Sequence, residues 1–322
     1  MILAYLVRRA GYGFVTVLGV LFFLFVLFFL VTKPEDIARK AVGEKAPPEA
    51  IAQWIANHGY DKPRFWNPEH PADTLVVEHF RRALTFEFGR SDADDVPITR
   101  RLREGVGPSL ALTGPLFLLE IPITIALALL VALFRGTYID RMGVVACVLA
   151  MSVSILLYII GGQYVLGKVL KWFPISGFDP RPSVIVRFLA LPILVGLMAA
   201  VGEGVRFYRT VFVEESDRDH VRTARAKGCT DREVMTRHVL RNALIPILTQ
   251  VVVAIPFLFT GSLLLESFFG IPGLGSMTVE AIHGNDFATL RTMVYIGALL
   301  FVAGQIVTDV SYVLVDPRVR LE

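Results

Sequence analysis

Six long apolar stretches limit what this chain can fold into, because each is about as long as a helix that crosses a lipid bilayer. A bilayer core is crossed by roughly 20 consecutive, mainly apolar residues in a helix. The stretches occupy residues 12–31, 110–134, 142–166, 188–205, 245–265 and 292–315. Several contain proline or glycine, which transmembrane helices tolerate. The sequence therefore predicts an all-α membrane protein with six transmembrane helices.

The composition supports a membrane protein and argues against a nucleic-acid partner. Of the 322 residues, 54% are hydrophobic even though this count omits glycine. A soluble protein is about 45–50% apolar with glycine included. The net charge of +3 is small, and the basic residues do not gather on one periodic face as in a nucleic-acid-binding protein. We expect the lipid bilayer to surround this chain and no nucleic acid to bind it.

The chain is expected to have three parts. The first apolar stretch follows Arg8 and Arg9, as a signal peptide would, but it is too long and lacks a small-residue cleavage site. We therefore expect residues 1–32 to form a retained transmembrane helix. Residues 33–108 are polar, mixed in charge and rich in proline, which predicts a small folded insert outside the cytoplasm. Residues 109–322 would form a five-helix core.

Lysine and arginine in the short loops predict the orientation, because cytoplasmic loops carry an excess of both. With a cytoplasmic N-terminus, the inner loops hold many bases, among them Arg8, Arg9, Arg135, Arg141, those at 206–241, Arg318 and Arg320. The short outer loops hold fewer, namely Lys168, Lys171, Arg181, Arg187 and Arg291. Both termini and the charged segment 214–246 are therefore expected in the cytoplasm.

Segment 214–246 predicts two helices separated by a glycine. Ser216 and Asp217 are favourable N-cap residues for the first helix. Lys227 suits a helix C-terminus, and Gly228 can adopt the left-handed conformation that ends a helix. We therefore expect a first helix over residues 217–227 and a positive φ at Gly228.

The second helix of the segment has its own start signal. Thr230 and Glu233 are spaced as a capping box, in which each side chain accepts from the other residue's backbone N–H. An apolar stripe follows, opposite a face that carries charge. The stripe is formed by Met235, Val239, Leu240, Ala243 and Leu244, and the charged face by Arg232, Glu233, Arg237 and Arg241.

The order of residues in this segment resembles a known family. HVRTARAKG at 220–228 and RHVLRNALIP at 237–246 are similar to the cytoplasmic EAA loop of ABC importer permeases, in the dipeptide/oligopeptide/nickel branch. GYDKP at 59–63, FGRS at 88–91 and DPRVR at 316–320 also resemble family segments. Two departures stand out: His220 replaces a usual aromatic residue, and TKPED at 32–36 replaces the usual A-P-G-D-P.

The resemblance implies a function and a set of partners. The chain would be the membrane-spanning permease subunit of an ATP-driven importer in the bacterial inner membrane. Its partners would be a second homologous permease, two cytoplasmic ATPase subunits that bind the ATP, and an extracytoplasmic solute-binding protein. Oligopeptides or dipeptides are the favoured cargo, with nickel chelates, glutathione or oligosaccharides as alternatives. No cofactor is expected in this chain.

The resemblance also assigns a site. The first helix of segment 214–246 would be the coupling helix that docks in a groove of the ATPase. Small Ala224 would let its backbone approach the groove wall. The predicted coupling residues are Asp219, His220, Val221, Arg222, Thr223, Ala224, Arg225, Ala226, Lys227 and Gly228.

Catalytic and metal-binding signatures are missing from the sequence. It contains no G-x-x-x-x-G-K-[ST] phosphate loop and no H-E-x-x-H zinc motif. The segment GIPGLG at 270–275 is rich in glycine, as phosphate-binding turns are, but we expect neither a strand before it nor a helix after it. It resembles instead a family segment that follows the fifth span. No enzymatic activity is therefore expected.

Four acids lie within or at the ends of the apolar stretches, namely Glu120, Glu203, Glu266 and Asp309. An ionisable residue inside a membrane is costly and suggests a function. For Glu203 we favour a structural pair with Arg206, and for Glu266 and Asp309 a structural or gating role. Two other classes stay open on these acids: an ion-coupled secondary transporter and an intramembrane enzyme.

Overall fold

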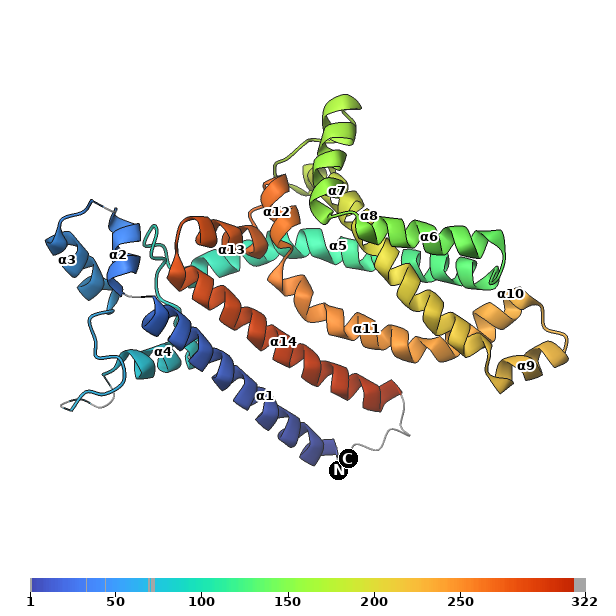
Figure 1. The fold of residues 1–322 in the computed structure, drawn as a ribbon, viewed down its shortest axis with the longest axis horizontal. Helices are drawn as coiled ribbons and strands as arrows, with labels where there is room; N and C mark the ends of the chain where they lie inside the picture. The colour runs from blue at the N-terminus through green and yellow to red at the C-terminus, as the bar shows by residue number, and fades with distance from the viewer. Residues whose placement is uncertain (1, 33, 44, 69, 71–72, 316–322) are drawn as a thin grey trace.

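The structure is a computed structural model that describes residues 2–32, 34–43, 45–68, 70 and 73–315. Within these residues its elements are helices, joined by turns and by longer irregular segments such as 85–97 and 170–181 (Figure 1). Their bounds are α1 Ile2–Phe25, α2 Pro34–Val42, α3 Pro48–His58, α4 Leu75–Leu84, α5 Ile98–Leu133, α6 Tyr138–Ser152, α7 Ile155–Gly162, α8 Pro182–Ser216, α9 Asp219–Ala226, α10 Asp231–Glu233, α11 Leu240–Thr260, α12 Leu263–Phe269, α13 Leu274–His283 and α14 Phe287–Val315. Three π-helical segments, η1 Val26–Val31, η2 Gln163–Val169 and η3 Val234–Val239, continue the helices before them.

Among the described residues, five helices are long and apolar enough to cross a membrane, and there are six spans if α6 and α7 together count as one. The prediction of an all-α membrane fold is confirmed. The expectation that the third apolar stretch forms one continuous helix is wrong, since the chain bends by 88° between α6 and α7. Val153 has extended backbone angles there, and the Ser154 side chain accepts from the Leu156 N–H at the start of α7.

Two other element bounds differ from the apolar stretches. The fifth stretch is interrupted at Gly261, where φ is +74°, so α11 ends at Thr260 and α12 follows as a separate short helix. α5 begins at Ile98 and so reaches well into the segment 33–108. The C-terminal DPRVR segment at 316–320 lies outside the described residues.

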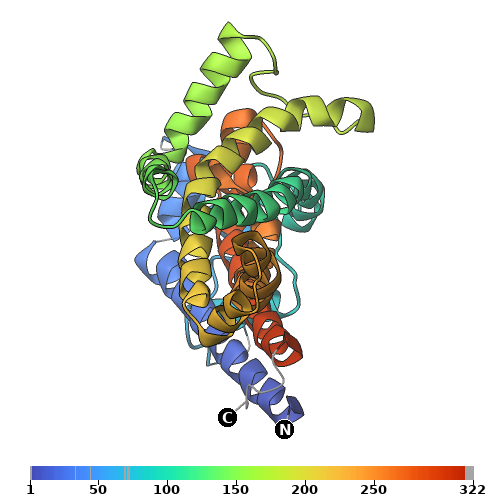
Figure 2. The same ribbon diagram turned by 90° about the vertical axis from the view of Figure 1, so that its right-hand side faces the viewer.

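The long helices pack in two groups. α5 packs along α8, and α6 also packs against α8. α14 packs against both α1 and α11, and both views show α1 and α14 side by side (Figures 1 and 2). The Arg9 guanidinium and the Asp309 carboxylate form an ion pair of 3.0 Å between α1 and α14. α7 and the start of α8 extend away from the other helices at the top of Figure 2.

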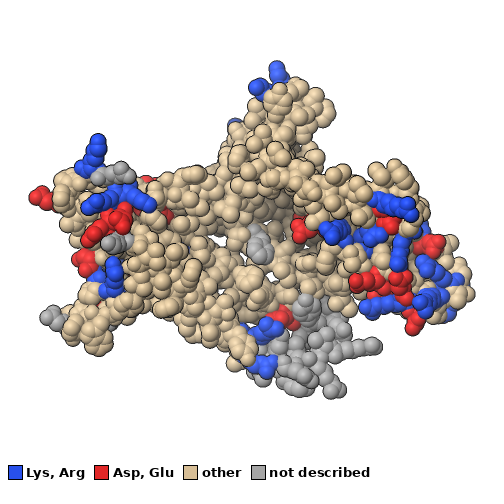
Figure 3. All heavy atoms as spheres, viewed as in Figure 1, with Lys and Arg blue, Asp and Glu red and all other residues tan. Residues whose placement is uncertain are grey.

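Charged side chains gather at opposite ends of the long axis (Figure 3). One group covers the insert helices α2–α4 at the left, and the other covers α9 and α10 at the right. The surface between them is largely uncharged on this face. This is the distribution expected when an apolar bilayer surrounds the middle of a protein and water surrounds its ends.

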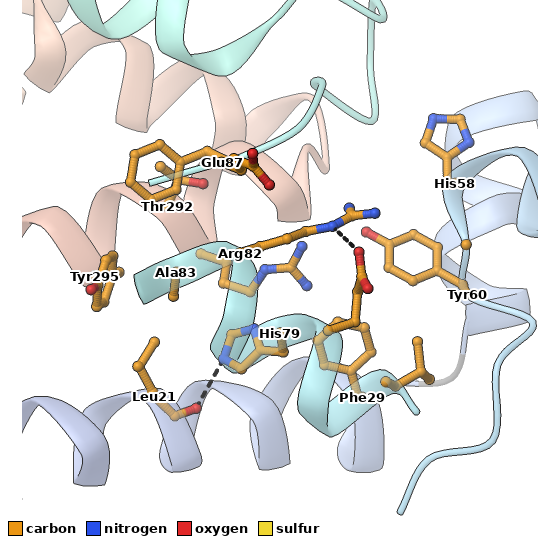
Figure 4. A pocket seen from close by; sticks show the side chains of 15 residues that line it. Leu21, Phe29, His58, Tyr60, His79, Arg82, Ala83, Glu87, Thr292 and Tyr295 are labelled. Atoms are coloured by element: carbon orange, nitrogen blue, oxygen red, sulfur yellow. Dashed lines mark hydrogen bonds and ion pairs between the residues drawn. The ribbon is translucent and has the colours of Figure 1, made fainter. Parts of the chain in front are cut away.

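The insert packs onto α1 and α14 through aromatic side chains. Phe25 of α1 and Phe29 of η1 contact the His79 ring of α4, and Tyr60 contacts Phe29. His79 points toward α1, where its Nε2 lies 3.1 Å from the Leu21 carbonyl oxygen (Figure 4). The described part of the insert therefore packs against the membrane helices.

Candidate functional site

The helix α9 begins two residues later than the sequence suggests. Ser216 is the last residue of α8, and its hydroxyl donates to the Phe212 carbonyl at 2.6 Å. The Asp217 carboxylate accepts from Arg135 Nη1 at 2.8 Å, and the N-cap position of α9 is Arg218. The expectation that these two residues cap the first helix is therefore wrong. α8 extends to Ser216 because Phe212 and Glu215 are buried and hold its last turn against the rest of the protein.

The other end of α9 follows the prediction. Lys227 stands at the C-cap, and Gly228 has a φ of +86°. The Cys229 N–H donates to the Ala224 carbonyl at 3.3 Å, which closes the last turn over the glycine. The positive φ predicted for Gly228 is confirmed.

The start of the second helix also follows the prediction. The Thr230 N–H donates to Glu233 Oε2 at 3.0 Å, and the Glu233 N–H donates to Thr230 Oγ1 at 3.4 Å. These bonds form the predicted capping box. α10, η3 and α11 then continue from Asp231 to Thr260.

An apolar core lies beneath α9 and fixes its orientation. Val221 and Ala224 are buried in one cluster with Phe212 of α8 and with Val234 and Met235 of the second helix. This core gives α9 an inward face and an outward face.

The predicted apolar stripe of the second helix is only partly buried. Met235, Val239 and Ala243 are buried, Leu240 is half-buried and Leu244 is exposed. The segment η3 is π-helical, which has more residues per turn than an α-helix. It therefore changes which of the side chains that follow it face inward.

The inward position of Ala224 corrects one expectation. Its side chain is only 5% exposed and contacts the protein's own core, so it is not available to a partner's groove. Ala226 is instead exposed, on the outward side of the same helix. A helix of eight residues has too few apolar positions to show from sequence which of its alanines faces inward.

The outward face of α9 carries charge and has weak internal pairing. Arg222 and Asp219 are 3.4 Å apart, and Arg225 lies 3.5 Å from Asp231. Exposed pairs of this kind contribute about 0–1 kcal/mol each. The exposed predicted residues are Asp219, Arg222, Thr223, Arg225, Ala226, Lys227 and Gly228. This face is held in place by the core beneath it, and its cations are available to a partner.

His220 connects α9 to the neighbouring helices. Its Nε2 lies 2.9 Å from Asn242 Nδ2 on α11 and 3.4 Å from Glu215 Oε1 on α8. The Glu215 carboxylate is buried and also pairs with Arg218 at 2.9 Å. The polar ring at position 220 therefore joins three helices at a place where the family resemblance predicts an aromatic residue.

Comparison with known proteins identifies the family of this chain. Residues 124–321 match the family of binding-protein-dependent transport system inner membrane components. Residues 2–81 match the N-terminal region of the same kind of membrane component. The chain belongs to this family. It is thus the permease subunit of an ABC importer, a multi-pass protein of the inner membrane.

Individual relatives match over almost their whole length. A protein of Brucella abortus with the provisional name of a peptide transport system permease protein is 30% identical over 92% of this chain and 94% of its own. A similarly named protein of Brucella melitensis is 29% identical over 100% of both chains. The glutathione transport system permease protein of Salmonella typhimurium is 29% identical over 94% of both.

Glu266 joins three segments of the permease. Its carboxylate is fully buried and accepts from the N–H groups of Ser262, Gly275 and Ser276 and from the Ser109 hydroxyl, at 2.7–3.1 Å. These donors come from the starts of α12 and α13 and from α5. A structural or gating role is expected for Glu266, and these hydrogen bonds support the structural one.

The glycine-rich segment 270–275 differs from expectation in one respect. A helix does follow it, because α13 begins at Leu274. The N-terminal amides of α13 are already occupied by the Glu266 carboxylate. Gly273 and Gly275 are needed there, since a Cβ on either would come within 3 Å of Glu266 or of the Ser262 backbone. The segment binds a side chain of its own protein.

The remaining two membrane acids lie together. Glu120 of α5 and Glu203 of α8 line one cavity of about 310 Å³ between α5, α8 and α11. The pair expected between Glu203 and Arg206 is absent from the ion pairs of the described residues. The sequence did not indicate that these two acids meet, because their approach depends on how α5 packs along α8.

Proposed function

We propose that this permease carries oligopeptides or dipeptides and that the outward face of α9 is the surface on which the ATPase docks. The observation that carries the docking proposal is the division of α9 into two faces. Val221 and Ala224 fasten the helix to the permease core, and Arg222, Arg225 and Ala226 stand exposed. A push on α9 would be transmitted through this core to α8 and α11.

The cargo proposal rests on the relatives. Two of them are named for peptide transport and one for glutathione, which is itself a small peptide. Nickel chelates and oligosaccharides remain the alternatives. The proposed complete importer contains a second homologous permease, two cytoplasmic ATP-binding subunits and an extracytoplasmic solute-binding protein.

The docking proposal is tested by changing only the outward face. Reversing Arg222 and Arg225 to glutamate, or enlarging Ala226→Trp, should leave membrane insertion normal and release the ATPase during purification in detergent. Truncating a desolvated interface charge costs about 2–5 kcal/mol, which is enough to lose most of the bound ATPase. Arg187→Glu, an exposed arginine near the start of α8, is the matched control. Full ATPase stoichiometry in the reversed variants would overturn the proposal.

We also propose that both termini and α9 lie in the cytoplasm and that the insert lies outside. The charge distribution over the short loops supports this orientation. Single cysteines at Asp231 and Asp61, with Cys147 and Cys229 replaced, can be labelled from outside with an impermeant maleimide. Asp61→Cys should react and Asp231→Cys should not. The reverse pattern would contradict the orientation, and uptake that continues without ATP would favour an ion-coupled transporter.

A further inference from the structure

The cavity between α5, α8 and α11 has an unusual lining for a site inside a membrane protein. Its volume of about 310 Å³ is within the range of small-molecule sites, about 300–1,000 Å³. No lysine, arginine or histidine of the described chain lines it. The side chains that matter here are Glu120, Glu203, Gln250, Tyr208, Phe117 and Phe207.

The two carboxylates of this cavity have no counter-charge within the described part of the chain. Asp309 pairs with Arg9, and Glu266 accepts four hydrogen bonds. Glu120 and Glu203 instead line the same cavity, and neither takes part in an ion pair among the described residues. Two like charges at membrane depth are costly unless a cation joins them.

Tyr208 supplies a second, independent sign of a ligand. The residue is only 7% exposed, and it lines the same cavity as Glu120. Among the described residues, no partner forms a hydrogen bond with its hydroxyl. The hydroxyl therefore has its hydrogen-bonding capacity free on the side of the cavity. The hydroxyl and the two carboxylates are therefore available to the same bound group.

We propose that this cavity binds the ammonium group of the transported peptide, an inference that rests on the peptide function proposed above. An ammonium offers three hydrogen-bond donors, which the Glu120 and Glu203 carboxylates and the Tyr208 hydroxyl can accept. The aromatic rings of Phe117 and Phe207 add faces that attract cations. A peptide with a free N-terminus satisfies this lining, whereas an N-acetylated peptide or an oligosaccharide does not.

The test compares uptake of trialanine and N-acetyl-trialanine by the complete importer in proteoliposomes. The solute-binding protein is the same throughout, so its own preference cancels when variants are compared. The ratio of free to acetylated peptide uptake should fall at least tenfold in the double variant Glu120→Gln with Glu203→Gln. Glu280→Gln, which removes an exposed acid of α13 outside the cavity, should keep the wild-type ratio.

Each outcome supports or overturns the proposal that the cavity binds an ammonium group. An unchanged ratio in the double variant overturns it. Loss of the permease pair on purification, with the ratio unchanged in what remains, would mean that the acids bind a partner subunit, which also overturns it. Tyr208→Phe provides a second variant that keeps both charges and should lower the ratio by a smaller factor. If the wild type hydrolyses ATP but takes up neither peptide, the peptide function fails, and that result is distinct from an unchanged ratio.

Discussion

The two charged ends of the permease are built in different ways. At the α9 end, the hydrogen bonds that end α9 and begin the second helix join residues close in sequence, such as Ala224 with Cys229 and Thr230 with Glu233. At the insert end, they join residues far apart, such as His79 with Leu21 and Ser91 with Asp286. The first end presents a charged face outward, and the second is fastened inward onto the membrane helices.

The comparison suggests that the two ends can be disturbed independently. Asp286, just before α14, holds the insert in place, since it is 2% exposed and accepts from Ser91, Asp92 and Thr289 at 2.6–3.0 Å. Asp286→Ala should destabilise the docked insert by about 3 kcal/mol, because buried donors lose a charged acceptor. Trypsin cleavage of the insert should accelerate, while ATPase retention should not change.

The control for this change is Asp61→Ala, which removes an exposed acid from the same insert. It should leave the cleavage rate at the wild-type value. If Asp286→Ala leaves the insert protected, or releases the ATPase as well, the two ends are not independent in the way described.

Mild acid should weaken the insert end through His79. Burial, together with the nearby Arg291 charge, lowers the pKa of His79 from 6.5 to about 4. The folded state therefore binds the proton less well than the unfolded state, so stability is complete above pH 6.5 and falls as the pH drops toward 4. At pH 5.5 the loss should be about 1.4 kcal/mol.

Hydrogen exchange of the insert at pH 7.5 and 5.5, corrected for intrinsic rates, measures this loss. Wild-type protection should fall about tenfold, the equivalent of about 1.4 kcal/mol. His79→Gln should show a smaller change because the titrating ring is gone. Equal changes in both proteins would exclude His79 as the cause.

A smaller effect is expected at the α9 end. A Cβ on Gly228 would meet no atom within 4 Å, so a substitution there acts only through the backbone. Gly228→Val should cost roughly 1 kcal/mol because a β-branched residue fits a positive φ poorly. Gly228→Asn should cost less, since asparagine tolerates that conformation. Partial loss of uptake with normal insertion is the expected result, and wild-type uptake by the valine variant would count against the helix break.

The difference between local and long-range contacts also explains which features could be predicted from the sequence. The capping box at Thr230 and the glycine break at Gly228 depend on a few adjacent residues, and both are confirmed. The predicted start of α9 is wrong because Asp217 pairs with Arg135, which lies 82 positions away in the chain. The inward position of Ala224 depends on the tertiary core in the same way.

The acidic residues in and near the membrane-spanning helices show the same limit of prediction from sequence. A structural or gating role for Glu266 and Asp309 could be expected from the sequence, but their partners Ser109 and Arg9 could not. The bend between α6 and α7 could not be predicted either, because the apolar run passes through Val153 without a glycine or proline to mark it.

The central claim, that the ATPase docks on the outward face of α9, is tested most directly by site-specific photo-crosslinking in the purified importer. A benzophenone maleimide is attached to a single cysteine at Ala226 or, at the opposite end, at Asp61, with Cys147 and Cys229 replaced by serine. We predict an adduct between the permease and the ATPase at Ala226→Cys and none at Asp61→Cys. Absence of the adduct at Ala226→Cys in an importer that still hydrolyses ATP would contradict the account.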